Sequence, residues 1–204
     1  MLEKLLVMII GYSFGCIQSA YAVGKIVGGI DIRNHGTSNA GASNVTTVLG
    51  WRYGLFVAII DILKGFFAVL FINLLYPGNV DLKILAGSMV IIGHVFPVVL
   101  GFRGGKGCAS FVGALLAINP VFGLLNIAMI IAITLTTNYI ALGTITMYIV
   151  MFVVGLFYNL TADIIIVTFL LLIVILWKHK INISRIISGT EVGFRDNLNR
   201  NKLR

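Results

Sequence analysis

The chain has 204 residues, of which 59% are hydrophobic and only 11% are charged. Because an average soluble domain is about 25% charged, this composition excludes an ordinary soluble globular protein and indicates an integral membrane protein. Lys and Arg outnumber Asp and Glu by 15 to 7, for a net charge of +8, which predicts basic cytoplasmic loops, binding of anionic ligands, or both.

Apolar segments along the chain predict seven transmembrane helices. A spanning helix needs about 20 mostly apolar residues, and fewer where it packs inside a bundle. The fourth segment is short and the last four run almost together, so five or six spans are the alternative. We expect an all-α integral membrane protein with a single polytopic domain over residues 1–204, in which residues 178–204 form a basic cytoplasmic interfacial tail. The predicted spans are 4–24, 54–76, 83–100, 107–118, 121–136, 139–157 and 162–177.

The positive charges predict which side of the membrane each loop occupies. With seven spans, the loop after span one, the loop after span three and the C-terminal tail share one side. They hold most of the cations, so this side is predicted to be cytoplasmic, with the N-terminus outside and the C-terminus inside. The cations are Lys25, Arg33 and Arg52 in the first loop, Arg103 and Lys106 in the second, and Lys178, Lys180, Arg185, Arg195, Arg200, Lys202 and Arg204 in the tail, against Lys4 and Lys83 on the other side.

The N-terminal segment resembles a secretory signal peptide only in part. The sequence Ala20-Tyr21-Ala22 fits a cleavage site, but Gly11 and Gly15 interrupt the apolar core, so we expect this segment to be the first span. The two cysteines, Cys16 and Cys108, show no metal-binding spacing and no disulfide framework.

The first predicted cytoplasmic loop contains the polar stretch DIRNHGTSNAGASNV, residues 31–45. Glycines permit positive φ and close backbone approach, so consecutive N–H groups can turn toward an anion. Hydroxyl and amide side chains add further donors. An ordinary polar loop is the alternative, but this segment lacks the Lys and Glu typical of one. The candidate ligands are Thr37, Ser38, Asn39, Gly41 and Asn44.

The second stretch, GHVFPVVLGFRGGKG, covers residues 93–107. It does not match the Walker spacing, but a glycine loop again precedes a predicted helix N-terminus, where N–H groups and the helix dipole favour an anion. Lys106 supplies a point charge, and the Arg103 guanidinium can bind phosphate through two hydrogen bonds. Two interfacial cations that follow the positive-inside rule are the alternative, which leaves the glycines unexplained.

Three further positions carry ionisable or polar groups at the predicted membrane surface or within it. His94 lies near the end of span three, where it is either a structural hydrogen-bonding residue or a functional one. Asp61 and Lys64 are three residues apart on span two and are expected to pair for structural reasons. In the third stretch, HKINISRIISGTE (residues 179–191), His179 and Asn182 would share one helix face. An amphipathic interfacial tail is the alternative there.

Taken in order, these three stretches resemble the motifs of the bacterial acyl-phosphate-dependent glycerol-3-phosphate acyltransferase family (PlsY), and the resemblance covers nearly the whole chain. It implies a multi-pass enzyme of the bacterial cell membrane, with its active site facing the cytoplasm. The enzyme would transfer a fatty acyl group from acyl phosphate to the sn-1 hydroxyl of glycerol 3-phosphate, giving lysophosphatidic acid and phosphate. The resemblance implies no cofactor and no metal. We expect membrane lipid as a partner, no nucleic acid, and a monomer.

The resemblance also assigns residues to the site. Lys106, His179, Asn182 and Thr144 are expected in catalysis, although the residues alone do not choose between His179 and His94 as proton carrier. The first motif is expected to bind substrate through Thr37, Ser38, Asn39, Gly41 and Asn44. The other expected substrate-binding residues are His94, Arg103, Gly104, Gly105 and Glu191.

Several positions depart from the family pattern. Thr47 replaces an expected arginine, Ala141 replaces a serine, and Cys16-Ile17-Gln18 replaces Ser-Ile-Pro. Loss of a phosphate-binding guanidinium at position 47 leaves Arg33, Arg52 or Arg103 as the compensating cation. The alternatives to an active acyltransferase are an inactive paralogue and a transporter or binding protein for a phosphorylated solute. A transporter requires access from both faces, whereas the predicted external loops are short and nearly free of cations.

Overall fold

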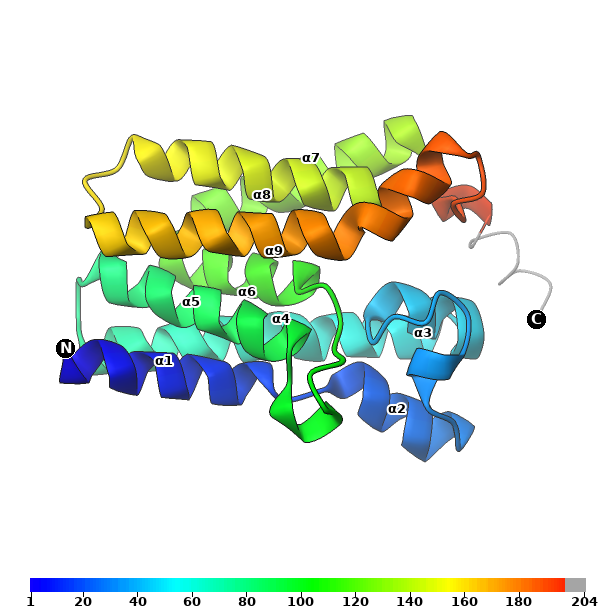
Figure 1. Cartoon of the computed structure of the whole chain (residues 1–204), viewed down its shortest axis with the longest axis horizontal. Helices are drawn as coiled ribbons and strands as arrows, with labels where there is room; N and C mark the ends of the chain where they lie inside the picture. Colours follow the sequence, from blue (N-terminus) through cyan, green and yellow to red (C-terminus); the bar gives the residue numbers. More distant parts are fainter. Residues whose placement is uncertain (197–204) are drawn as a thin grey trace. The chain divides into compact units, whose positions relative to one another are not determined.

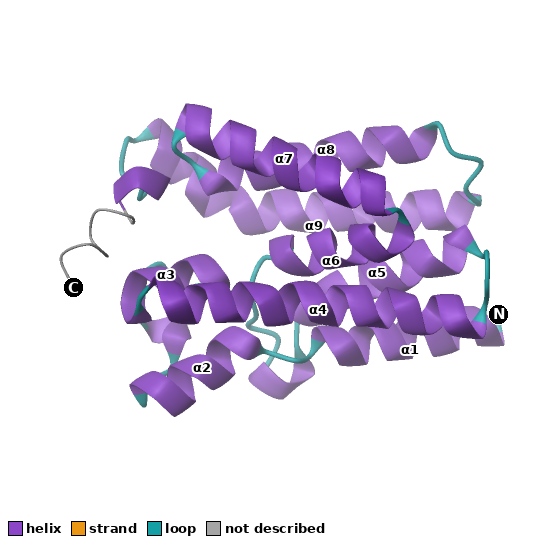
Figure 2. Ribbon diagram, turned by 180° about the vertical axis from the view of Figure 1, so that it is seen from behind, coloured by secondary structure: helices purple, strands orange, loops and turns teal. Residues whose placement is uncertain are grey.

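The computed structural model describes residues 1–196, and every regular element in this range is a helix (Figure 1; Figure 2). Five helical segments are long and apolar enough to cross a membrane, which agrees with the predicted all-α membrane fold. They are Leu2–Gly28, Trp51–Leu75, Val80–Leu100, Pro120–Thr137 and Ala162–Ile187, and two shorter apolar helices are Cys108–Ile118 and Ile140–Leu156. Each of these seven segments overlaps one of the seven predicted spans. Full crossing by the two shorter helices stays a prediction.

The helices divide into two compact units. The first, Met1–Gly123, contains α1 (Leu2–Gly15), α2 (Ser19–Gly28), α3 (Ala42–Leu49), α4 (Trp51–Leu75), α5 (Val80–Val95) and α6 (Cys108–Ile118), with the 3-10 turns η1 (Ile32–Asn34) and η2 (Val98–Leu100). The second, Leu124–Arg204, contains most of α7 (Pro120–Thr137), α8 (Ile140–Leu156) and α9 (Ala162–Ile187). That residues 1–204 form one domain stays a prediction.

The first predicted span is two helices rather than one. Helix α1 ends at Gly15 and α2 begins at Ser19, and the break between them holds Cys16, Ile17 and Gln18. The Gln18 side chain partly closes this break, because its Nε2 donates to the Gly15 carbonyl at 3.1 Å. The break brings backbone carbonyls into the interior of the first unit, where they require hydrogen-bond donors.

Glycines allow the helices of the first unit to approach closely. Helix α1 packs on α5 and α4 packs on α6. A Cβ added to Gly15 would collide with the Val90 carbonyl, and one added to Gly113 would collide with the Ile62 carbonyl. Small residues at such crossings are typical of membrane helices, which associate through close packing because lipid removes the usual hydrophobic drive.

The first polar loop is supported by a small apolar core and is shorter than the sequence indicates. Its last part is helix α3, which packs against α4. Side chains from α2, η1, α3 and α4 bury one another beneath the loop, and they are Ala20, Val23, Ile32, Val45 and Val57. The loop therefore rests on packed helices rather than projecting freely.

In the second unit, α8 packs against α9. The last predicted span stops at residue 177, but α9 continues to Ile187. No Gly or Pro interrupts α9 before Gly189, which has φ +69° and ends the helix in the left-handed conformation. His179 and Asn182 therefore lie on the last helix. The tail cations Arg200, Lys202 and Arg204 lie outside the described residues.

Candidate active site

The first polar loop is organised around the side chain of Asn44. This residue on α3 is fully buried. Its Oδ1 accepts from the Thr37 backbone N–H at 2.7 Å, and its Nδ2 donates to the Ile32 and His35 carbonyls, both at 2.9 Å. Gly36, with φ +59°, lies so close to the Asn44 amide that a Cβ there would collide with Oδ1. Asn44 thus shapes residues 32–37 from inside.

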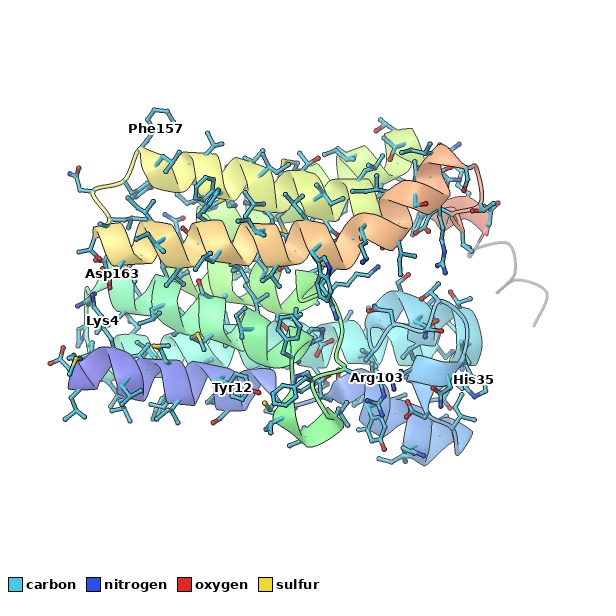
Figure 3. The ribbon with its side chains drawn as sticks, in the orientation of Figure 1. Lys4, Tyr12, His35, Arg103, Phe157 and Asp163 are labelled. Atoms are coloured by element: carbon cyan, nitrogen blue, oxygen red, sulfur yellow. The ribbon has the colours of Figure 1, made fainter. Side chains whose placement is uncertain are left out.

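The second loop is fixed at its start by Tyr12 of α1, and Figure 3 labels both Tyr12 and Arg103. The Tyr12 hydroxyl donates to the Phe96 carbonyl at 2.8 Å and accepts from the Val98 N–H at 3.1 Å. Gly101 and Phe102 then adopt positive φ, at 59° and 61°. The Arg103 side chain is exposed and that of Lys106 is half-buried.

The two loops contact each other at Gly105. Its N–H donates to the His94 carbonyl at 3.1 Å. A Cβ added to Gly105 would collide with the His94 imidazole and would lie 2.5 Å from the Ala40 carbonyl of the first loop. Glycine is therefore required here because two backbones and a ring meet in the space that a side chain would fill.

Arg33 joins the same two loops a second time. Its guanidinium binds the Asp31 carboxylate through Nε at 3.0 Å and Nη2 at 2.8 Å, and its Nη1 donates to the Leu100 carbonyl at 2.9 Å. It also stacks 5.1 Å from the centre of the Tyr21 ring. These contacts direct the guanidinium of Arg33 to Asp31 and to the second loop. Compensation by Arg33 for the arginine expected at position 47 stays a prediction.

The hydrogen bond from Arg33 lowers the pKa of Asp31 to about 2, from an ordinary value of 3.8. The same carboxylate raises the pKa of Arg33. The pair is only partly exposed, at 16% and 20% of the two side chains, and it remains ionised over the physiological pH range.

Both loops lead into helix N-termini through a glycine. Gly41 precedes α3, and Gly107, with φ +81°, precedes α6. The first N–H groups of each helix lack intrahelical partners and carry the positive end of the helix dipole. Because Ala40 and Gly105 are in contact, the two N-termini begin within a few residues of one point. This arrangement suits anionic groups.

His94 is 4% exposed and belongs to a buried polar network that the sequence revealed only in part. The expected pair is present, with Lys64 Nζ 2.8 Å from Asp61 Oδ1. The sequence did not reveal that Lys64 Nζ also lies 2.7 Å from His94 Nδ1, or that Ser19 Oγ donates to Asp61 Oδ1 at 2.9 Å. The only feature of the sequence that pointed to these additional contacts was the polar dipeptide Gln18-Ser19 within an apolar run.

The second unit holds the third group of predicted site residues. His179 is 2% exposed, and its Nδ1 lies 2.9 Å from the Ile175 carbonyl. A carbonyl can only accept, so Nδ1 carries a ring proton. Asn182 donates to Glu191 Oε1 at 2.5 Å. Thr144 is also buried, and its hydroxyl donates to the Ile140 carbonyl at 3.1 Å.

The structure thus gathers the predicted residues in two groups, one in each unit. The first unit holds the two loops that meet at Gly105, and the second holds His179, Asn182 and Glu191 on or just after α9 together with Thr144 on α8. Among residues 1–196, no three His, Cys, Asp or Glu side chains are grouped to hold a metal ion. Apart from Asn44, the predicted loop ligands with at least partial exposure are Thr37, Ser38, Asn39, Arg103, Gly104 and Lys106. Gly41 and Gly105 are buried and can offer only backbone groups.

Comparison with known proteins gives one consistent result. A family model described as glycerol-3-phosphate acyltransferase matches residues 5–189. A glycerol-3-phosphate acyltransferase of Thermoanaerobacter sp. (strain X514) is 40% identical over 186 residues, which cover 91% of this chain and 93% of that protein. Glycerol-3-phosphate acyltransferase 1 of Oceanobacillus iheyensis is 40% identical over 190 residues, covering 90% and 91% of the two chains.

Two solved structures are similar over almost the whole length. Both are crystal structures of PlsY, an integral membrane glycerol 3-phosphate acyltransferase. The glycerol 3-phosphate form has a TM-score of 0.84 and 31% identity, covering 94% of this chain and 95% of that one. The lysophosphatidic acid form has a TM-score of 0.81 and 30% identity, covering 96% and 98%.

Proposed function

Because this chain belongs to the glycerol-3-phosphate acyltransferase family, we propose that it transfers a fatty acyl group from acyl phosphate to the sn-1 hydroxyl of glycerol 3-phosphate. The new ester bond forms as the acyl–phosphate bond breaks, which gives lysophosphatidic acid and inorganic phosphate. The hydroxyl proton passes to a base of the protein.

The observation that carries this proposal is the contact between the two polar loops at Gly105. Each loop precedes the N-terminus of a helix, α3 or α6. The reaction requires two phosphorylated substrates close together, and it therefore requires two neighbouring sets of anion-binding groups. Thr37, Ser38 and Asn39 supply donors from the first loop, and Gly104, Gly105 and Lys106 supply them from the second.

The chemistry needs no covalent intermediate with the protein. An acyl phosphate is a mixed anhydride and is already activated, so the enzyme must orient the hydroxyl and stabilise the developing oxyanion. Lys106 supports this step as a positive charge at the start of α6. Asn44 acts through the loop that it shapes rather than by touching substrate, because its amide atoms bind the backbone.

We assign the proton transfer to His179. With Nδ1 held by the Ile175 carbonyl, Nε2 of the neutral ring can accept the proton of the attacking hydroxyl. Asn182 and Glu191 form one hydrogen-bonded pair near this ring, and Thr144 supplies a hydroxyl from α8. This assignment requires the third motif to meet the first two at one substrate site.

The reaction is proposed to take place at the cytoplasmic face of the bacterial cell membrane, with the acyl chain among the helices and the head groups at the loops. The distribution of cations supports this orientation. We propose a monomer as the active form, in which one chain supplies both loops and the third motif.

The test is release of phosphate and lysophosphatidic acid from palmitoyl phosphate and glycerol 3-phosphate by the purified full chain. We expect Lys106→Ala to lower kcat/KM by about 10²- to 10³-fold, the range for removing one group that stabilises transition-state charge. The matched control is Lys83→Ala on α5, which should retain activity. Unchanged activity in Lys106→Ala would contradict the assignment of this lysine.

Thr47 is the reason for testing a second candidate, an inactive paralogue. Its hydroxyl donates to the Ser43 carbonyl at 3.0 Å, so it offers no cation where the family pattern has arginine. An inactive wild type together with an active Thr47→Arg variant would indicate an inactive paralogue. Uptake of labelled glycerol 3-phosphate into proteoliposomes without acyl transfer would instead indicate a transporter.

A further inference from the structure

We propose that Lys64 is a positioning residue for the reaction: it holds His94 in the tautomer whose Nε2–H faces the glycine loop, where that N–H binds a substrate phosphate. The inference rests on the proposed function, because it assigns a role within that site. It goes beyond pairing of Lys64 with Asp61, which a structural ion pair alone would explain.

The position of Lys64 follows from the break between α1 and α2. Its Nζ lies 2.6 Å from the Ile17 carbonyl and 3.4 Å from the Gly15 carbonyl. These carbonyls belong to the C-terminal end of α1 and to the break, where the helix dipole favours a cation. On the other side, Ser19 at the first position of α2 donates to Asp61. Each charge of the buried pair therefore faces the helix end that favours it.

The hydrogen bonds of Lys64 determine the protonation of His94. An ammonium has three N–H donors and no acceptor. Three short contacts account for them, to the Ile17 carbonyl at 2.6 Å, to Asp61 Oδ1 at 2.8 Å and to His94 Nδ1 at 2.7 Å. Because the ammonium can only donate, Nδ1 of His94 must accept, and the ring proton is on Nε2.

A charged Lys64 is the state that these surroundings favour. Lys64, Asp61 and His94 are all at most 4% exposed. A neutral amine would leave the Asp61 carboxylate buried without its cation and would place a lone pair among carbonyl oxygens, which is costly in a dry interior. With Asp61 ionised, the net charge of the pair is zero only when the lysine is protonated.

The Nε2 edge of His94 lies against the loop that the proposed function assigns to phosphate. A Cβ on Gly105 would collide with this nitrogen, so the ring edge and the Gly105 backbone are in direct contact. In the opposite tautomer Nε2 would present a lone pair to the loop, and a lone pair repels a phosphate oxygen. Lys64 thus determines whether His94 presents an N–H donor or a lone pair to an anion.

The first test reads the tautomer without reference to activity. The full chain is labelled with 15N-histidine in detergent, with His35→Gln to simplify the spectrum, and the His94 signal is assigned by its loss in His94→Gln. We expect an unprotonated Nδ1 and a protonated Nε2 in His94. A protonated Nδ1 would overturn the inference. If no variant transfers acyl groups, the proposed function fails, but this spectrum still decides the tautomer.

The second test separates positioning from folding. Lys64→Met alone leaves Asp61 unpaired and can fail to fold, so Asp61→Leu is combined with it to remove both charges, and thermal unfolding verifies the fold. We expect the double variant to raise the KM for one phosphorylated substrate about 10- to 100-fold, the effect of one hydrogen bond to a charged group. Its kcat should change little, as for lost ground-state binding.

If Lys64 had only a structural role, its loss would lower the amount of folded enzyme and leave both KM values unchanged. Unchanged KM values in the folded double variant would therefore overturn the inference. His94→Gln supplies a further check, because a glutamine amide can present an N–H without help from Lys64. In that background the double change should leave KM at the His94→Gln value, whereas an additional 10-fold rise would contradict the coupling. Lys83→Met serves as the matched lysine control.

Discussion

Asn44 shows how a residue of a binding motif acts by shaping the backbone. Its side chain satisfies three backbone groups of residues 32–37 from a fully buried position. Buried polar groups that lose their partner cost about 1–3 kcal/mol each. The site therefore depends on Asn44 for the shape of the first loop, even though its amide is directed at the protein itself.

We predict that Asn44→Ala lowers the free energy of unfolding by about 2–4 kcal/mol, because the buried carbonyl and N–H groups lose their partners. Thermal unfolding in detergent measures this change. Ser43→Ala, an exposed neighbour on the same helix, is the control and should leave stability nearly unchanged. An Asn44→Ala protein as stable as the wild type would show that the loop holds its shape without this side chain.

The Asp31–Arg33 pair predicts a specific pH dependence of stability. The pKa of Asp31 is lowered to about 2 from 3.8, so the unfolded chain binds this proton more readily than the folded one. The stabilisation is therefore fully present above about pH 4, and is lost as the pH falls through about 2. We expect unfolding curves of the wild type to show this loss, whereas Asp31→Asn should lack it and be less stable at pH 7.

Loop elements in this protein are defined by contacts that leave no room for side chains. Gly105 lies against the His94 ring and the Ala40 carbonyl, which belong to segments more than fifty residues apart. The sequence predicted an anion-binding glycine loop. The structure adds that Gly105 lies where two loops and a helix end meet.

We predict that Gly105→Ala lowers kcat/KM by about 10²-fold, because the added methyl must separate the two loops and small displacements at a reacting centre have effects of that size. The acyl transfer assay measures this loss. Gly155→Ala on α8 is the matched control, since its Cβ would meet only Leu160 at 3.8 Å. A Gly105→Ala enzyme with normal kinetics would mean that the contact between the loops has no part in the reaction.

Helix boundaries show where local patterns were sufficient and where they were not. The apolar runs located the helices well, because lipid requires long apolar segments with internally satisfied backbones. The break after Gly15 and the extension of α9 to Ile187 were missed. Hydropathy averaged over a whole span does not report the break, because the polar residues Gln18 and Ser19 lie within a long apolar run. Hydropathy falls at Trp177 although the helical hydrogen bonds of α9 continue.

At the scale of the whole molecule, the proposed site requires the loops and the end of α9 to lie on the same side of the membrane. In a chain with Cys16 and Cys108 replaced, single cysteines at the exposed positions His35, Arg103 and Ser188 should all react with a membrane-impermeant reagent from the cytoplasmic side only. Asn159 between α8 and α9 should react only from outside. Labelling of Arg103 and Ser188 from opposite sides would contradict the proposed site.

The sequence by itself determined the membrane class, the approximate helices, the three motifs and their family, because composition, hydropathy and motif spacing are properties of short contiguous segments. The tertiary structure alone decided that Asn44 binds backbone, that Arg33 is occupied by Asp31 and Leu100, and that Lys64 reaches His94. These contacts join residues that are from 2 to 67 positions apart. Most of them depend on how helices pack, and no local pattern specifies which buried donor meets which acceptor.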